Sequence, residues 1–463
     1  MEKAFAEWPR SLWADNSLKW DFPEVELSNS FDVVIVGAGY SGLWTAHHLL
    51  NFNPSLSVAI LDACQPGFGA SGRNGGWCSA FSPMSLEAIA SQSDREGARE
   101  LQNALVASVD EIGSYIANSG IDCGWHKGGT LSFASSQLQL QAIKETIEMS
   151  RDFGYDDSFM TYLSPEQAEN RVHVRGSHGA SYSPHCAALH PAQLVDGLVN
   201  QLLGRNVQIF GSTQVTEINP HQITARTYKG TVVIDAKWIV RATEGFTARM
   251  KQYRRDVAPL YSYMIATEPL SDAQWQDIGW TNRETVSDGR NLIIYVQRTA
   301  DGRIAFGGRG APYKFASRIG SDFDNNPKIH SLIETSMREM FPSIDDVAIT
   351  HRWGGALGVH RDWFASANVN HKENIATLGG YVGDGVAFSY VAAKEVARNI
   401  VGERHDARPL PIVNHVSPRW EPEPFRYVGI NSILRLTERA DESEKRTGRK
   451  NRFVNWLLGK LIP

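Results

Sequence analysis

The spacing of hydrophobic residues changes twice within a short stretch near the start of the chain. Residues 31–36 form an apolar run rich in β-branched residues, a pattern that predicts a buried strand. From Ser41 to about Asn51 the apolar positions recur with the period of a helix. The sequence G-x-G-x-x-G occupies residues 37–42, between these two patterns. The stretch is typical of a strand that enters a helix through a tight glycine turn, where a helix N-terminus can hold a pyrophosphate.

The remaining hydrophobic patterns predict alternating β-rich and helical segments. Residues 1–30 show neither pattern, and we expect them to form an irregular, tryptophan-bearing leader that packs on the rest of the chain. The tail from residue 402 is proline-rich, then helical, then basic. The other expected segments are strands at 57–61, 128–134 and 231–243, a helix followed by strands at 189–218, a β-rich region at 257–310, helices at 84–119, 137–154 and 327–341, and a second strand, glycine turn and helix at 373–400.

Composition and charge exclude several classes of protein. The chain has 463 residues, enough for two or three domains, and its net charge of −5 argues against a nucleic-acid-binding protein. Its four cysteines form no C-x-x-C pair, which favours a reduced, cytoplasmic protein. No secretory h-region, apolar run of transmembrane length, H-E-x-x-H sequence or G-x-S-x-G sequence is present. We therefore expect a soluble protein with no metal site and no hydrolytic serine.

An acidic residue marks the end of the second predicted strand. Asp62 lies 20 residues beyond Gly42, the last glycine of the turn. An acid at this position can hydrogen-bond the ribose hydroxyls of an adenosine, and it would repel a 2′-phosphate. The first strand, the glycine turn, the helix and Asp62 together predict a dinucleotide site, which either NAD or FAD could occupy.

Three features favour FAD over NAD. The sequence GFGASGRNGG at 67–76 adds a second loop rich in hydrogen-bond donors, more than a nicotinamide unit requires. The sequence GGYVGDGVAFS at 379–389 places another helix N-terminus far along the chain, where its partial positive charge could stabilise reduced flavin. No second G-x-G-x-x-G follows a strand, so the two-nucleotide arrangement of NAD(P)H-dependent flavin reductases is not indicated.

From residue 30 to about residue 400 the sequence resembles the D-amino-acid oxidase/glycine oxidase superfamily of FAD-dependent amine oxidoreductases. The resemblance is strongest to its γ-glutamylputrescine oxidoreductase-like branch. It rests on an ordered succession of motifs, of which LDACQPGFGASGRNGG is the most specific. The others are VVIVGAGYSGLWTAHHL, HKGGTLSFA, LHPAQLVDGL, VRAT, TEPL, DGRNLIIYVQRTADGRIAFGG, HRWGGALGVHRD and GGYVGDGVAFS.

The resemblance implies an α/β (α+β) fold, with a Rossmann-like FAD-binding domain interleaved with a β-rich substrate-binding domain. The expected FAD-binding segments are 30–90, 185–250 and 345–410. The expected substrate-binding segments are 91–184 and 251–344, and 411–463 forms a C-terminal extension.

The resemblance also implies which residues contact FAD. Gly37, Gly39, Gly42 and Asp62 should hold the ADP half. Asp384 should lie by the flavin, or else point away from it or cap the following helix. The other expected cofactor residues are Tyr40, Ser41, Ala63, Ser71, Gly72, Arg73, Asn74, Gly75, Gly76, Val215, Ala242, Thr243, Gly380, Gly383, Gly385 and Val386. Some relatives attach FAD covalently through a histidine in the early loop or a late cysteine. This chain has Asn74 and Gly75 in that loop and no cysteine after Cys186, so we expect non-covalent FAD, although Cys78 lies close to the loop.

The implied reaction is hydride transfer from an amine-bearing carbon to the flavin, followed by hydrolysis of the imine to a carbonyl compound. The candidate substrate residues are chosen from aromatic and basic positions on predicted strands and in family motifs. Tyr261 and Tyr263 share one strand face by period-two alternation, and Tyr295 lies on a neighbouring predicted strand. The full set is Tyr261, Tyr263, Tyr295, Arg309, Trp353, His360 and Tyr381. Tyrosines with an arginine would suit a primary or secondary aliphatic amine that carries an anionic group.

The electron acceptor is left open by the sequence. Oxygen, with hydrogen peroxide as product, is one acceptor, and an electron carrier such as quinone is the other. The tail sequence RKNRFVNWLLGKLIP combines basic and apolar residues and could contact an anionic membrane, although packing on its own domain or a partner is the more common role. A flavoprotein without catalytic activity is a third alternative.

Overall fold

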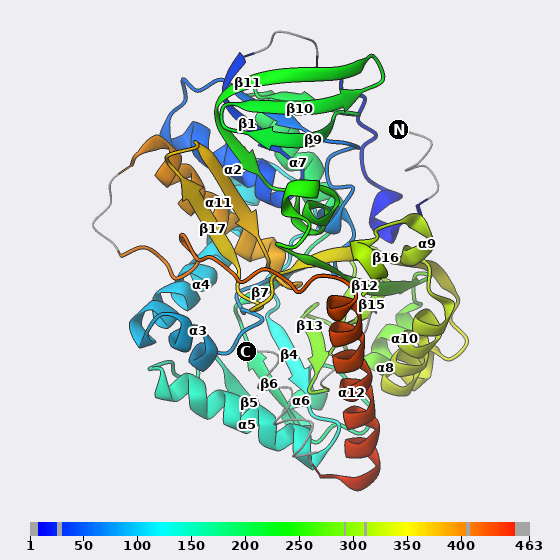
Figure 1. The fold of residues 1–463 in the computed structure, drawn as a ribbon. Helices are drawn as coiled ribbons and strands as arrows, with labels where there is room; N and C mark the ends of the chain where they lie inside the picture. Colours follow the sequence, from blue (N-terminus) through cyan, green and yellow to red (C-terminus); the bar gives the residue numbers. More distant parts are fainter. Residues whose placement is uncertain (1–7, 26–29, 291–292, 310–312, 404–407, 450–463) are drawn as a thin grey trace.

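Two large β-sheets with helices around them form the molecule in this computed structural model (Figure 1). The structure describes all residues except 1–7, 26–29, 291–292, 310–312, 404–407 and 450–463. The predicted α/β fold class is confirmed. The helices are α2 (Tyr40–Phe52), α3 (Leu86–Gln92), α4 (Arg95–Asn118), α5 (Gln137–Asp152), α6 (Pro165–Glu169), α7 (Pro191–Leu203), α8 (Asp272–Ile278), α9 (Ser321–Asp324), α10 (Pro327–Met340), α11 (Gly385–Val401) and α12 (Phe425–Thr447).

The first sheet has the strand order β17-β18-β11-β1-β2-β8, with β10 and β9 continuing from one end of β11. Strands β18, β11, β1, β2 and β8 run parallel to their neighbours in this row, and β17 is antiparallel to β18. The strands are β1 (Ser30–Val36), β2 (Val58–Leu61), β8 (Gln208–Phe210), β9 (Gln214–Asn219), β10 (Gln222–Thr227), β11 (Gly230–Arg241), β17 (Ser366–Asn370) and β18 (Ile375–Gly379).

Alternation along β1 explains how both faces of this sheet are buried. Val33 and Ile35 share a hydrophobic cluster with residues of α2, α7 and α11. Val34 and Val36 point to the opposite face, where they pack with residues of β9 and β10. A continuous apolar run is the pattern expected of such a doubly covered strand.

The second sheet has the order β16-β12-β15-β14-β13-β4-β6-β5 and is antiparallel except between β13 and β4. Its strands are β4 (Thr130–Phe133), β5 (Thr161–Leu163), β6 (Ala180–Ser183), β12 (Ala258–Thr267), β13 (Thr285–Asp288), β14 (Ile294–Arg298), β15 (Ile304–Arg309) and β16 (Ile349–Val359). A further pair, β3 (Trp77–Ser79) and β7 (Cys186–Ala188), lies apart from both sheets in the pairing. Helix α10 packs on β12 and β15.

The predicted helical segment 84–119 consists of two helices because Asp94 starts a new one. Its side chain accepts a hydrogen bond from the N–H of Gly97 and caps α4. Strand β16 pairs with β12 in the second sheet, although its residues fall in the range 345–410 that the sequence assigned to the FAD-binding domain. The division into domains with the boundaries given above stays a prediction.

The part of the leader that the structure describes, residues 8–25, includes one short 3₁₀ turn, η1 (Leu12–Ala14). Trp13 is 1% exposed and packs with Met264 of β12 and Trp353 of β16. Asp15 contacts His351 of β16, and Asp196 of α7 accepts hydrogen bonds from Leu18 N–H and the indole of Trp20. The leader therefore links the helical layer of the first sheet to one edge of the second. Among the described residues, no helix combines the length and apolarity needed to span a bilayer.

Candidate functional site: a dinucleotide cavity

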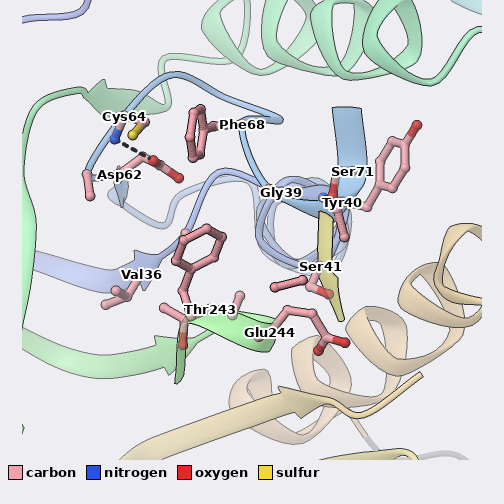
Figure 2. Close-up of a pocket in the computed structure, with 18 of the residues that line it drawn as sticks. Val36, Gly39, Tyr40, Ser41, Asp62, Cys64, Phe68, Ser71, Thr243 and Glu244 are labelled. Atoms are coloured by element: carbon pink, nitrogen blue, oxygen red, sulfur yellow. Dashed lines mark hydrogen bonds between the residues drawn. The ribbon is translucent and has the colours of Figure 1, made fainter. Parts of the chain in front are cut away.

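A cavity of about 330 Å³ lies at the carboxyl ends of the parallel strands β1, β2 and β11. Figure 2 shows the start of α2 near Gly39, with Asp62 and Phe68 on one side and Glu244 on the other. This is the edge of a parallel sheet at which α/β proteins bind ligands. The cavity is lined by these residues from the predicted cofactor set: Gly37, Gly39, Tyr40, Ser41, Asp62, Ala63, Ser71, Asn74, Val215, Ala242, Thr243, Gly383, Gly385 and Val386.

The glycine turn brings backbone segments so close together that Gly37 and Gly42 have no room for a side chain. Gly37 has φ +109°, and a Cβ there would lie 2.5 Å from the carbonyl oxygen of Ala242. A Cβ on Gly42 would lie 2.0 Å from the carbonyl oxygen of Gly37, so Gly42 is needed for the helix to begin here, although it does not itself line the cavity. Gly39 is the N-cap of α2 and gives no side-chain cap. The N–H of Tyr40 donates to Ser71 Oγ at 2.9 Å, and the N–H groups that follow it at the start of α2 are available to a pyrophosphate.

Asp62 lies at the cavity wall with both carboxylate oxygens in use. One accepts the N–H of Ala38 at 2.7 Å and the other the N–H of Cys64 at 2.8 Å. Burial raises the pKa of Asp62, while these two hydrogen bonds oppose the rise. Each oxygen keeps a second lone pair, so the carboxylate can still accept hydrogen bonds from ribose hydroxyls.

In the second half of the glycine loop (residues 67–76), the backbone carbonyl groups are hydrogen-bonded to residues outside the loop. Five consecutive carbonyls, from Gly72 to Gly76, each accept a hydrogen bond from outside the loop. Their donors, in order, are Ser11 Oγ, Trp353 Nε1, Trp13 Nε1, Gln297 Nε2 and the N–H of Leu189.

The hydrogen bonds of these carbonyls also determine the direction of the N–H groups on the opposite side of the loop. A peptide C=O and the N–H of the next residue point in opposite directions. Because the carbonyls of Arg73 and Asn74 are held on the outer side, the N–H groups of Asn74 and Gly75 turn toward the cavity. They are suited to the acceptor atoms of a flavin, which gives Gly75 a role although it does not line the cavity, whereas the N–H of Gly76 donates to Asn74 Oδ1 at 2.7 Å.

Arg73 does not line the cavity, so its expected place among the residues that contact FAD is not supported. Its guanidinium forms an ion pair with Asp324 at 3.1 Å, and the two side chains are 9% and 0% exposed. It also donates to the carbonyls of Phe68, Pro9 and Gly354. Arg73 therefore joins the glycine loop to the leader and to β16.

Glu244 is a cavity residue that sequence reasoning missed. Its carboxylate accepts the N–H of Gly358 at 3.2 Å and the N–H of Gly380 at 3.1 Å. Burial raises the pKa of Glu244 to about 7, and the two hydrogen bonds act against that rise. Its backbone has φ +42°, a strained value for a non-glycine residue. The carboxyl group thus links the end of β16 to the glycine turn before α11. Gly380 does not line the cavity, and its contribution is the N–H that makes this link.

Tyr381 is the member of the candidate substrate set that lines the cavity. Its hydroxyl lies 2.9 Å from Ser41 Oγ at the start of α2, and burial raises its pKa. Asp384 is the N-cap of α11 but makes no capping hydrogen bond and does not line the cavity, which favours the alternative that it points away from the flavin. Its charge adds to burial in raising the pKa of Cys186 to about 12, which places it toward β7.

Tyr261 and Tyr263 share one face of β12, as predicted, and neither of them lines the cavity. The Tyr263 hydroxyl donates to the carbonyl of Phe323 at 2.7 Å, and the Tyr261 hydroxyl accepts the N–H of Gly320 at 3.1 Å. Their burial, at 2% and 0% exposure, places them in the core beside α10. Alternation puts Ser262 on the opposite face, and a place for Tyr261 and Tyr263 at the substrate site stays a prediction.

Tyr295 of β14 lies on the same side as Ser262, and the two hydroxyls are 2.5 Å apart. Its ring would contact a Cβ on Gly75, so it faces the glycine loop. Trp353 is fully buried and donates to the carbonyl of Arg73, on the far side of the loop from the cavity. His360 is packed against Gly380, with Nδ1 2.7 Å from the carbonyl oxygen of Phe364. The side chain of Arg309 lies outside the part of the chain that the structure describes.

Several other cavity residues were not predicted. Phe68 and Phe246 supply aromatic surface, and Arg249 and Lys251 supply cations. Phe246, Arg249 and Lys251 follow the VRAT sequence that ends β11, so extending that motif by a few residues would have found them. The site as a whole combines an open helix N-terminus, a carboxylate that could accept ribose hydroxyls and a donor-rich loop, which fits a flavin dinucleotide.

Comparison with known proteins agrees with this fit. The gamma-glutamylputrescine oxidoreductase of Escherichia coli (strain K12) is 28% identical over 405 residues, which cover 86% of this chain and 90% of the relative. A probable oxidoreductase, OrdL, of Haemophilus influenzae is 26% identical over 412 residues, with 86% and 90% coverage. Among solved structures, glycine oxidase from Geobacillus kaustophilus has a TM-score of 0.68 at 18% identity, covering 84% of this chain and 99% of that chain.

L-alpha-glycerophosphate oxidase from Mycoplasma pneumoniae, solved with FAD bound, has a TM-score of 0.63 at 16% identity, covering 81% of this chain and 94% of that chain. At these identities the structural matches establish the fold. The DAO family, described as FAD dependent oxidoreductase, matches residues 32–399. The chain therefore belongs to the DAO family of FAD-dependent oxidoreductases.

Proposed function

We propose that this enzyme oxidises a primary or secondary aliphatic amine to an imine, which hydrolyses to a carbonyl compound and a free amine. Bound FAD supplies the hydride acceptor for this oxidation. The observation that carries the proposal is the match over nearly the whole length of gamma-glutamylputrescine oxidoreductase, a relative whose name specifies an amine substrate. The proposed acceptor is oxygen, with hydrogen peroxide as product.

The residues that we propose for FAD form three groups. Gly37, Gly39 and the N–H groups that follow that of Tyr40 at the start of α2 hold the pyrophosphate, and Asp62 binds the adenosine ribose. The N–H groups of Asn74 and Gly75 face the flavin. The remaining proposed contacts are Tyr40, Ser41, Ala63, Ser71, Val215, Ala242, Thr243, Gly383, Gly385 and Val386, to which the cavity adds Phe68, Glu244 and Phe246. Non-covalent attachment also remains part of the proposal.

The part that the protein plays in the reaction is orientation and exclusion of water. Hydride transfer requires a neutral amine, because an ammonium group withdraws electrons from the adjacent C–H bond. A buried site disfavours the ammonium form unless a charge compensates it. We place Tyr381, which lines the cavity, near the flavin, and the burial of its side chain supports a site with little water.

The test is anaerobic bleaching of the flavin absorbance of the purified holoenzyme by a panel of compounds. The panel contains amino acids, N-methyl amino acids, polyamines, γ-glutamyl amines and, as a contrasting class, hydroxy acids and glycerol phosphates. Rapid bleaching by one amine class supports the proposal and identifies the substrate group. Bleaching only by hydroxy compounds, or no bleaching of a fully loaded enzyme, overturns it.

The acceptor is then tested with the reduced enzyme. Rapid reoxidation by oxygen with stoichiometric hydrogen peroxide supports an oxidase. Slow reaction with oxygen, together with rapid reaction with a quinone and sedimentation with anionic vesicles, would instead indicate a membrane-associated dehydrogenase. The basic tail that suggested this alternative, including residues 450–463, lies almost entirely outside the described residues. The cytoplasmic location stays a prediction.

A further inference from the structure

A second cavity, of about 160 Å³, lies between α4 and α11, which pack against each other. None of its described lining residues also lines the dinucleotide cavity. Pockets for drug-sized ligands usually measure about 300–1,000 Å³. The second cavity is therefore separate from the cofactor site, and its size suits a molecule of only a few heavy atoms.

One part of this cavity is apolar. Ala104 and Ala107 lie three residues apart on one face of α4, and their small side chains leave the space open. Val391 of α11 and Leu410, in the segment after α11, line the same space. A short alkyl chain could cover these four side chains.

The other part is charged, with three cations and two carboxylates, Lys394, Arg398, Arg408, Glu111 and Glu395. Both carboxylates already accept hydrogen bonds. Glu111 accepts from the Tyr390 hydroxyl and from Lys394 Nζ, each at 2.7 Å. Glu395 accepts from the guanidinium of Arg398 at 3.1 Å. The lining therefore carries an excess of one positive charge.

The three cations keep donors for a further acceptor. An ammonium group has three N–H donors and a guanidinium has five. Among the described residues, Lys394 and Arg398 each donate one hydrogen bond. Arg408 pairs with Asp94 at 2.8 Å, but these side chains are 45% and 52% exposed. Exposed ion pairs contribute little to stability, so Arg408 can turn to another anion at low cost.

We propose that this cavity is an effector site for a small aliphatic carboxylate, which acts on FAD retention through α11. The carboxylate head accepts charge-assisted hydrogen bonds from the cations, and the alkyl chain lies on the apolar part. An amine would instead enter a positively charged cavity whose carboxylates already have donors. The inference goes beyond the proposed function and does not depend on amine oxidation.

Helix α11 separates the two cavities. Val386 and Ser389 line the dinucleotide cavity, whereas Tyr390, the next residue, lines the second one. The Tyr390 ring also contacts Trp44 and His48 of α2, with ring centroids 4.9 Å and 4.6 Å apart. A ligand that adds contacts between α4 and α11 restricts α11, and we expect FAD to leave more slowly.

The experiment uses butyrate as the probe and n-butanol as its uncharged analogue, at constant ionic strength. Ligand-observed NMR titration of the holoenzyme gives the Kd. Recovery of free flavin fluorescence after dilution gives the rate of FAD dissociation. Ala104→Leu fills the cavity and removes no charge. Its matched control is Ala117→Leu, at an exposed position of α4 that does not line the cavity.

A second pair of variants tests the charge. Arg408→Met removes a lining cation whose partner is exposed. Arg95→Met removes an equally exposed arginine of α4 that does not line the cavity.

For the wild-type holoenzyme we expect a Kd for butyrate on the order of 1 mM and about tenfold weaker binding of n-butanol. Saturating butyrate should slow FAD dissociation about fivefold. Ala104→Leu should abolish both effects, and Arg408→Met should weaken butyrate binding about tenfold. The two control variants should behave as the wild type does.

Butyrate binding that persists in Ala104→Leu would place the ligand elsewhere, such as the substrate site, and would overturn the inference. Equal affinity for n-butanol, or an unchanged rate of FAD dissociation at saturating butyrate, would also overturn it. If Ala104→Leu does not fold, Arg408→Met and the comparison of the two probes still decide. Failure of every amine to reduce the flavin would contradict only the proposed function.

Discussion

The ion pair of Arg73 and Asp324 should contribute strongly to stability, and the effect of breaking it should depend on pH. In Arg73→Met the carboxylate loses its buried partner, and three backbone carbonyls lose their donor. Removing one member of a buried, hydrogen-bonded ion pair costs about 3–5 kcal/mol. At about 2.1 cal/mol/K per residue, the unfolding entropy of a 463-residue chain is roughly 1 kcal/mol/K. The expected fall in Tm is therefore about 3–5 °C.

The pH dependence follows from the carboxyl group. Burial raises the pKa of Asp324 to about 7, and the charge of Arg73 opposes that rise. Without Arg73 the folded-state pKa rises further above the unfolded value, near 4. A group with a raised folded-state pKa stabilises the protein at low pH and loses that contribution as the pH increases. The fall in Tm should consequently be smaller at pH 6 than at pH 8.

Differential scanning calorimetry at one scan rate, at pH 6, 7 and 8, measures both quantities. The exposed pair of Arg95 and Asp152 provides the control, because its side chains are 53% and 70% exposed. Arg95→Met should lower the Tm by less than about 1 °C. The double variant Arg73→Met/Asp324→Asn should lose the pH dependence. An Arg73→Met effect as small as that of Arg95→Met, or one that shrinks as the pH rises, would refute the reasoning.

Three further outcomes are expected. Gly37→Ala should abolish FAD retention, seen as loss of flavin absorbance in purified protein, because its Cβ would lie 2.5 Å from a backbone oxygen at φ +109°; retention of FAD would exclude the proposed pyrophosphate-binding turn. FAD affinity, measured by quenching of free flavin fluorescence, should fall between pH 6 and pH 8. The reason is that the carboxyl of Glu244, with a pKa of about 7, ionises beside an anionic cofactor. In Glu244→Gln the FAD affinity should no longer depend on pH over this range. Trp13→Phe should speed FAD dissociation about two- to tenfold through loss of its bond to the glycine loop, whereas Trp20→Phe, which affects a bond to α7, should not.

Local patterns were sufficient to predict the cofactor end of the site. A strand, a glycine turn and an acid at the next strand end occur within about thirty residues, so their relative positions follow from the local backbone. This is why Gly37, Gly39 and Asp62 lie in the cavity as expected.

The substrate end could not be predicted in the same way. Period-two alternation shows that Tyr261 and Tyr263 share a face, but the packing of the sheet determines which face meets the cofactor. The direction of Arg73 depends on Asp324 and Gly354, which lie far away in the sequence. Glu244 belongs to no recognised motif. Its role depends on hydrogen bonds from the N–H groups of two glycines that are distant in the sequence.

The contacts of the leader also determine when, during synthesis of the chain, the surroundings of the glycine loop can form. Trp13 leaves the ribosome more than 300 residues before its neighbour Trp353, and Pro9 similarly precedes Gly354. At about 5–20 residues per second this interval is roughly 15–70 seconds. Strand β18, which completes the parallel sheet beside β11, is synthesised later still. Two of the five outer donors of the glycine loop, Gln297 and Trp353, are thus added only in the later part of the chain, and tight binding of the cofactor should be a post-translational event.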